Sequence, residues 1–151
     1  MWSLEVKLGG IQDLSALEGQ QRLKYLELWQ IRGLRDLSFI SSLSGLQYVF
    51  LQALRNVIAI PDLSRLVKLR RLSLQNMKAL VSALWSSPSL TEFIHVSTNN
   101  MQPEQYESIG KIATLERVLV GFGSKKKNQE FEAMVLRAGK ERFNGEKFVF
   151  E

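Results

Sequence analysis

The chain has 151 residues, of which 45% are hydrophobic and 23% are charged, a balance typical of one globular domain. It contains no cysteine, which excludes disulfides and thiolate metal sites, and no run of about 18 apolar residues, which excludes a transmembrane helix. The net charge of +5 favours acidic partners.

The first predicted element is a shortened repeat. Val6 and Leu8 alternate as in a strand, and Ile11, Leu14 and Leu17 follow at three-residue spacing. Only Trp2 is available to cover the exposed side of this repeat. Two interpretations stay open: a sparsely capped first turn, or the C-terminal portion of a longer protein.

Three full units follow, beginning at residues 23, 46 and 69, so the period is 23 residues. Each begins L-x-x-L-x-L, with Val49 as the one replacement, and its fourth and sixth residues share a face of a strand. Apolar residues then recur at every third position, which favours an extended or 3₁₀-like return path. These are Ile31, Leu34, Leu37 and Ile40; Leu54, Val57, Ile60 and Leu63; and Met77, Leu80 and Ala83. Stacked units would bury their leucines in one column.

This pattern resembles the leucine-rich-repeat family over roughly residues 3–120. The resemblance implies an α/β fold, a curved right-handed solenoid with a parallel sheet of six or seven strands on its concave face. The later apolar spacing is more similar to the cysteine-type repeats of plant resistance receptors than to the asparagine-type bacterial internalins, a likeness of backbone shape. One departure is that Ile31, Leu54 and Met77 stand where the family usually has Asn or Cys.

The strand near residues 90–97 can be placed in two frames. Phe93 and His95 point inward if the register from Leu90 is kept. A slip of one residue instead buries the aliphatic Ile94 and Val96, and it brings Asn99 to the family's asparagine position. We favour the second frame, and a fifth full strand follows at 115–120.

A helical pattern over 128–142 carries Phe131, Met134, Val135 and Ala138 on one face. After an Asn144-Gly145 turn, residues 147–150 read as a strand, which we expect to run parallel to 115–120. The chain is therefore predicted to be one domain, 1–151, with repeats over about 3–124 and a C-terminal cap over about 125–151.

Binding is expected on the concave face, where the third and fifth strand positions point outward. Tyr25, Tyr48 and Phe50, with Trp29 just beyond them, are predicted to form a contiguous aromatic patch flanked by arginines, and Tyr, Trp and Arg dominate interface hot spots. The candidate partner-binding residues are Tyr25, Trp29, Tyr48, Phe50, Arg70, Arg71, Phe93, His95 and Arg117. The alternative is that these side chains only stack between repeats and stabilise the sheet.

The single histidine, His95, has no nucleophile motif beside it, so we expect neither an enzyme nor a cofactor or metal site. A non-catalytic module that binds a protein partner is the favoured function. A bacterial immunity protein that blocks a toxin and a nucleic-acid-binding surface are alternatives; the latter would use Arg70, Arg71, Arg117 and the lysines at 125–127. The first residues lack a signal-peptide pattern, so we expect a cytoplasmic protein that does not contact a membrane.

Overall fold

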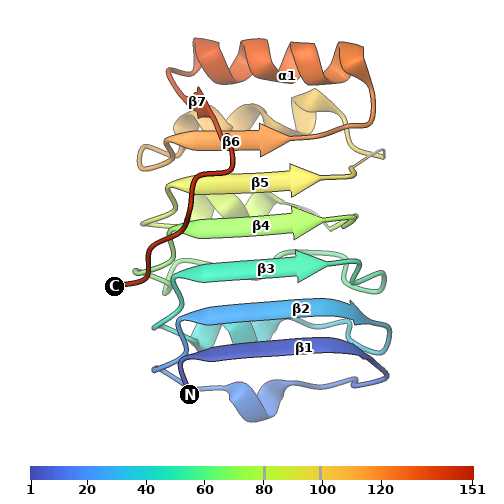
Figure 1. The fold of residues 1–151 in the computed structure, drawn as a ribbon, viewed down its shortest axis with the longest axis vertical. Coiled ribbons are helices and arrows are strands. Elements are labelled where there is room, and N and C mark those ends of the chain that lie inside the picture. The colour runs from blue at the N-terminus through green and yellow to red at the C-terminus, as the bar shows by residue number, and fades with distance from the viewer. Residues whose placement is uncertain (80, 99) are drawn as a thin grey trace.

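The computed structural model describes residues 1–79, 81–98 and 100–151. In this part of the chain, seven strands form one sheet in chain order, and every neighbouring pair is parallel (Figure 1). The parallel solenoid sheet that the sequence predicted is therefore confirmed. The strands are β1 (Ser3–Gly9), β2 (Tyr25–Ile31), β3 (Tyr48–Gln52), β4 (Arg71–Gln75), β5 (Glu92–Val96), β6 (Arg117–Val120) and β7 (Glu141–Arg142).

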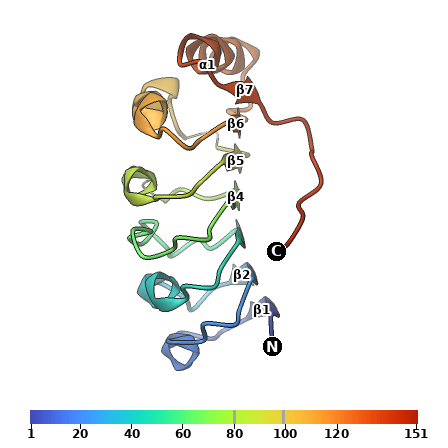
Figure 2. The same ribbon diagram turned by 90° about the vertical axis from the view of Figure 1, so that its left-hand side faces the viewer.

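Four of the five return paths between β1 and β6 contain a 3₁₀ helix, as the three-residue spacing of apolar side chains predicted, and the path from β3 to β4 does not. The helices are η1 (Ser15–Leu17), η2 (Ser38–Ser42), η3 (Ser82–Ser86) and η4 (Pro103–Lys111). All four lie on one side of the sheet (Figure 2). We call the opposite side of the sheet the open face. Leu80 and Asn99, which entered the sequence predictions, lie outside the described residues.

The core lies between the strands and the 3₁₀ helices. Leu26, Val49 and Leu72 are register partners on adjacent strands, and all three are buried. The apolar residues at every third position of two return paths are buried in the same cluster: Ile31, Leu34, Leu37 and Ile40, and Leu54, Val57, Ile60 and Leu63. The 23-residue period thus places equivalent side chains in contact from one repeat to the next.

Each of the first five strands has a residue in the left-handed backbone region within one position of its last residue. These residues are Leu8, Gln30, Ala53, Asn76 and Ser97, with φ between 51° and 62°. The Ala53 N–H donates to the Gln75 carbonyl at 3.0 Å, and the Asn76 N–H donates to the Val96 carbonyl at 3.0 Å. Each of these main-chain bonds joins the residue after one strand to the last residue of the next strand, close to the positions where Leu54 and Met77 stand in place of the family's asparagine.

A recurring Asp-Leu-Ser sequence shapes the return paths that follow β1, β2 and β3. In each copy, the aspartate carboxylate accepts hydrogen bonds from the N–H and the hydroxyl of the serine two residues later. The copies begin at Asp13, Asp36 and Asp62. The hydrogen bonds from Ser15 hold the pKa of Asp13 below its ordinary value, and the hydrogen bonds from Ser64 lower the pKa of Asp62 in the same way.

Two strand registers differ from those predicted. In β1, Leu4 and Val6 pair with Leu26 and Leu28, whereas Leu8 has a positive φ and is 59% exposed. In β5, Phe93 is the register partner of Leu72, which faces the core. The register favoured from the sequence, which placed Ile94 and Val96 toward the core, is therefore wrong. The chain keeps its alignment from Leu90 because neighbouring parallel strands fix which positions face the core.

The C-terminal region also departs from the prediction. Helix α1 (Lys125–Arg137) lies at the end of the stack, and β7 pairs parallel with β6 at residues 141–142. The predicted strand at 147–150 is wrong, because residues 143–151 have no regular secondary structure. Phe131 of α1 is buried, and its ring centroid lies 5.7 Å from those of Tyr106 and Phe122.

None of the helices in the described ranges combines the length and the apolar character needed to cross a lipid bilayer.

Candidate functional site

The side chains of the open face form three columns across the strands. The register defines the first column as Tyr25, Tyr48, Arg71, Glu92 and Arg117. The second column is Glu27, Phe50, Ser73, Ile94 and Leu119, and the third is Trp29, Gln52, Gln75 and Val96. The first column lies where the strands begin, and the third lies where they end.

Residues 143–151, which we call the tail, cross the open face along the first column. The tail leaves β7 and runs back over the strands toward the N-terminal repeats, on the side away from the 3₁₀ helices (Figures 1 and 2). It therefore covers part of the surface that the sequence predicted to be free for a partner.

Aromatic rings of the tail pack on the tyrosines of the first column. The Phe148 centroid lies 5.2 Å from that of Tyr48, and the Phe150 centroid lies 6.1 Å from that of Tyr25. Tyr25 and Tyr48 are themselves 5.1 Å apart. Trp2 packs on Phe150 at 5.1 Å. These mostly edge-on contacts have the geometry that favours aromatic pairs.

Two arginines bind both the rings and the main chain of the tail. The Arg70 guanidinium lies 4.7 Å from the Phe148 centroid and donates to the Val149 carbonyl at 2.6 Å. Arg71 lies 5.2 Å from the Phe148 centroid and donates to the Glu146 carbonyl at 2.6 Å. Both arginines are thus placed for cation–π contact and for hydrogen bonding at once.

Long polar side chains at the second repeat position complete the contacts. The Gln47 amide donates to the main-chain oxygen of Glu151 at 3.0 Å and accepts from its N–H at 2.9 Å. Lys24 donates to the same main-chain oxygen. Together with Arg70, these residues recur at an interval of 23 positions, so they lie in a row beside the first column.

A buried ion pair occupies the middle of the first column. Arg71 contacts the Glu92 carboxylate at 3.0 Å, and Arg117 contacts it at 3.4 Å. Arg71 is only 6% exposed, and its Nε atom has no hydrogen-bond partner among the described residues. Arg71 and Arg117 both pair with Glu92, whose single negative charge offsets part of theirs, and this weakens the case for a nucleic-acid surface built from them.

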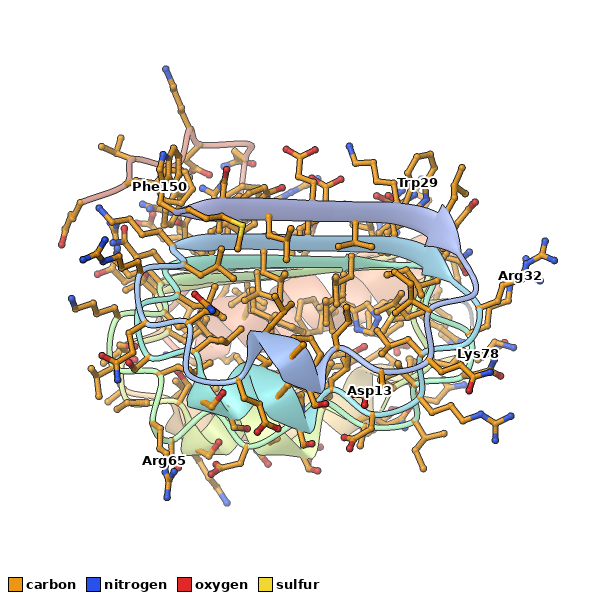
Figure 3. All side chains as sticks on the ribbon, turned by 90° about the horizontal axis from the view of Figure 1, so that it is seen from below. Asp13, Trp29, Arg32, Arg65, Lys78 and Phe150 are labelled. Carbon is orange, nitrogen blue, oxygen red and sulfur yellow. The ribbon has the colours of Figure 1, made fainter. Side chains whose placement is uncertain are left out.

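The predicted aromatic patch is divided by the fold. All four side chains are partly exposed, but Tyr25 and Tyr48 contact the tail, whereas Phe50 and Trp29 belong to the second and third columns. Viewed along the stack, Trp29 and Phe150 lie on the same side of the sheet but near opposite ends of the strands (Figure 3). The open face thus has a covered strip and an uncovered part.

Phe93 and His95 were predicted on the open face, and this is wrong: both are 0% exposed in the core. His95 Nε2 lies 3.2 Å from the Met77 carbonyl oxygen, and His95 Nδ1 lies 2.8 Å from the Tyr106 hydroxyl oxygen. A neutral ring with its proton on Nε2 satisfies both contacts, since it donates to Met77 and accepts from Tyr106. These two partners allow a polar side chain to replace the repeat's leucine.

Burial lowers the pKa of His95 from 6.5 to about 4, although its hydrogen bond to the Met77 carbonyl opposes the shift. Between these values the unfolded chain binds more protons at His95 than the folded chain does. We therefore expect the His95 contribution to stability to be complete above pH 6.5 and to fall, by up to about 1.4 kcal/mol per pH unit, as the pH is lowered toward 4.

Urea unfolding at a series of pH values measures this slope. The variant His95→Leu with Tyr106→Phe lacks the titrating ring and its hydroxyl partner, so the part of the slope between pH 6.5 and about 4 should disappear. Tyr106→Phe alone retains the ring and serves as the control. An equal slope in the double variant would contradict the assignment to His95.

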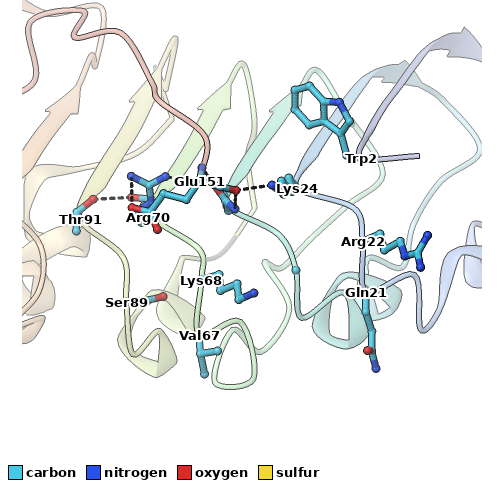
Figure 4. Close-up of a pocket in the computed structure, with 12 residues that line it drawn as sticks. Trp2, Gln21, Arg22, Lys24, Val67, Lys68, Arg70, Ser89, Thr91 and Glu151 are labelled. Atoms are coloured by element: carbon cyan, nitrogen blue, oxygen red, sulfur yellow. Dashed lines mark hydrogen bonds and ion pairs between the residues drawn. The ribbon is translucent and has the colours of Figure 1, made fainter.

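A hollow of about 680 Å³ opens beside the end of the tail (Figure 4). Arg22, Lys24, Lys68 and Arg70 contribute four cationic side chains to its lining, and Glu151 contributes one carboxylate. Arg70 pairs with Glu151 at 3.7 Å, whereas none of the ion pairs among the described residues includes Arg22 or Lys68. The hollow is therefore positively charged.

Sequence reasoning missed Glu92, Gln47 and the two tail phenylalanines. The register that continues from Leu90 places Glu92 between Arg71 and Arg117. The opposite charges of these three residues were therefore a sequence signal for the correct register. The aligned long side chains Lys24, Gln47 and Arg70 were a second signal. In the described residues, no group of three or more His, Cys, Asp or Glu side chains could hold a metal ion.

Residues 9–77 match a family model described as R13L1/DRL21 LRRs, that is, leucine-rich repeats. No curated protein matches the chain.

Proposed function

Because the chain is a leucine-rich repeat protein, we propose that its open face is the concave face of a solenoid and that the chain is a non-catalytic module which binds a protein partner through this face. One observation carries the proposal. Trp29, Phe50, Val96 and Leu119 remain partly exposed in the second and third columns, outside the packed core. Large apolar side chains gathered on one exposed face commonly mark an interaction site.

On this proposal α1 acts as a cap for the last repeat. Phe131 and Val135 of α1 are buried, and the helix packs on η4 and β6. Without such a helix the end of a repeat stack presents its apolar core to water. The cap leaves the open face available, because α1 lies at the end of the stack (Figure 1).

A paired comparison of variants tests the interaction function. Trp29→Ala combined with Phe50→Ala removes two aromatic side chains from the uncovered part of the open face. Truncating one central hot-spot residue costs about 2 kcal/mol or more, which is roughly thirtyfold in affinity. We expect the double variant to lose the partner that the unchanged protein captures from native lysate, measured by quantitative mass spectrometry and then by titration.

The matched control is Ile58→Ala combined with Leu136→Ala. Both side chains are exposed and lie outside the strands, so this variant should capture the partner as the unchanged protein does. Circular dichroism establishes that both variants are folded. Capture at full strength by the Trp29 and Phe50 double variant would show that this part of the open face is not the interface.

A further inference from the structure

The tail binds the open face as an extended segment with one side toward the sheet. Glu146, Phe148 and Phe150 are partly buried, whereas Lys147, Val149 and Glu151 are exposed. This alternation has a period of two, which is the period of an extended chain. The tail therefore presents two aromatic side chains, two residues apart, to the first column.

The tail beyond Phe143 is held on the sheet by side-chain contacts. Within the described residues, its hydrogen bonds to the strands and their preceding loops come from Arg70, Arg71, Gln47 and Lys24, with no main-chain ladder. Its phenylalanines are only half-buried. A segment held in this way can leave the surface without breaking any strand pairing.

Acidic residues flank the two aromatic positions and meet the cations of the face. The Glu146 carboxylate lies 4.0 Å from the Arg117 guanidinium, and the Glu151 carboxylate lies 3.7 Å from Arg70. The positively charged hollow, with Arg22 and Lys68, extends beyond this point (Figure 4). The strip thus combines aromatic rings that pack on the tail, arginine side chains that donate hydrogen bonds to main-chain carbonyls, and excess positive charge.

We propose that the strip formed by Tyr25, Tyr48, Arg70 and Arg71 is a binding site for an extended acidic protein segment with two aromatic side chains two residues apart, and that residues 146–151 are an internal ligand which such a partner displaces. This inference rests on the proposed interaction function and specifies the chemistry of the partner. The two aromatic rings of the partner pack on Tyr25 and Tyr48, and Arg70 and Arg71 donate hydrogen bonds to its main-chain carbonyls. The surrounding cations favour acidic residues on either side of the aromatic pair.

The test uses the full chain and a fluorescein-labelled synthetic peptide with the sequence of residues 145–151. A short tether gives the internal tail a millimolar effective concentration, so it competes with the added peptide. Phe148→Ala combined with Phe150→Ala weakens the internal tail. We expect this variant to bind the peptide at least tenfold more tightly than the unchanged protein does, measured by fluorescence anisotropy.

The matched control is Lys147→Ala combined with Val149→Ala, whose side chains face solvent, and it should bind the peptide as weakly as the unchanged protein. A peptide in which alanine replaces both phenylalanines should not bind the Phe148→Ala, Phe150→Ala variant. If the double variant loses its melting transition, the single variants Phe148→Ala and Phe150→Ala supply the same comparison, with a gain of at least threefold expected.

The proposal would be overturned if the Phe148→Ala, Phe150→Ala variant and the unchanged protein bound the peptide with equal affinity. A tenfold gain for a labelled single-stranded oligonucleotide without a gain for the peptide would overturn it as well. Either result leaves the partner-capture test with Trp29 and Phe50 unaffected, because those residues lie outside the strip. Failure of the tail proposal is therefore distinguishable from failure of the interaction function.

Discussion

Replacing Phe131 with alanine is expected to lower the free energy of unfolding by about 3–5 kcal/mol, because the ring is buried among Tyr106 and Phe122 at the end of the stack. The lost side chain leaves a cavity and removes the main apolar anchor of α1. Urea unfolding followed by circular dichroism measures the change. We also expect a greater tendency to aggregate, since the apolar end of the last repeat becomes accessible.

The same helix provides the control for this prediction. Leu136 is 70% exposed, so Leu136→Ala removes an aliphatic side chain from α1 without opening the core. Its effect should stay within about 0.5 kcal/mol, as for ordinary surface substitutions. A loss below about 1 kcal/mol for Phe131→Ala would mean that the helix is not needed to cover the repeats.

Leu72→Ala is expected to cost about 2–5 kcal/mol, because Leu72 is 1% exposed in the central buried column. It packs between Val49 of the preceding strand and Phe93 of the following one. The loss should therefore affect both neighbouring repeats, and unfolding monitored by circular dichroism should shift to a lower midpoint. Ile58→Ala, at a side chain that is 77% exposed, is the comparison that should leave the midpoint almost unchanged.

The strands β2, β3 and β4 could be predicted because their repeats share one length. Identical spacing places leucine on leucine, and apolar burial then favours a single register. The interval from Leu69 to Leu90 is only 21 residues, so the period gave no guidance for β5. A preference for aliphatic core residues then led to the wrong frame. His95 is buried because Met77 and Tyr106 satisfy its ring, and neither contact follows from repeat spacing.

The candidate site was predicted only in part for a related reason. Outward strand positions follow from the alternation of side chains, and Tyr25, Trp29, Tyr48 and Phe50 are all partly exposed. The alternating sequence of residues 147–150 is compatible both with a paired strand and with a segment that crosses a sheet. Which of these forms depends on distant partners: Arg70 and Tyr48 offer a cationic and aromatic surface, whereas β6 offers pairing only as far as Arg142.

The contacts of the tail also change how this repeat protein assembles. In a simple stack, contacts join neighbouring repeats, so folding can nucleate anywhere and the ends fray independently. Glu151 instead contacts Lys24 and Gln47, which are 127 and 104 residues away in sequence. Such contacts have a large loop-closure cost and form only when the intervening repeats are already ordered. Docking of the tail is therefore a late step, and opening of any repeat between β2 and β6 removes the geometry on which it depends.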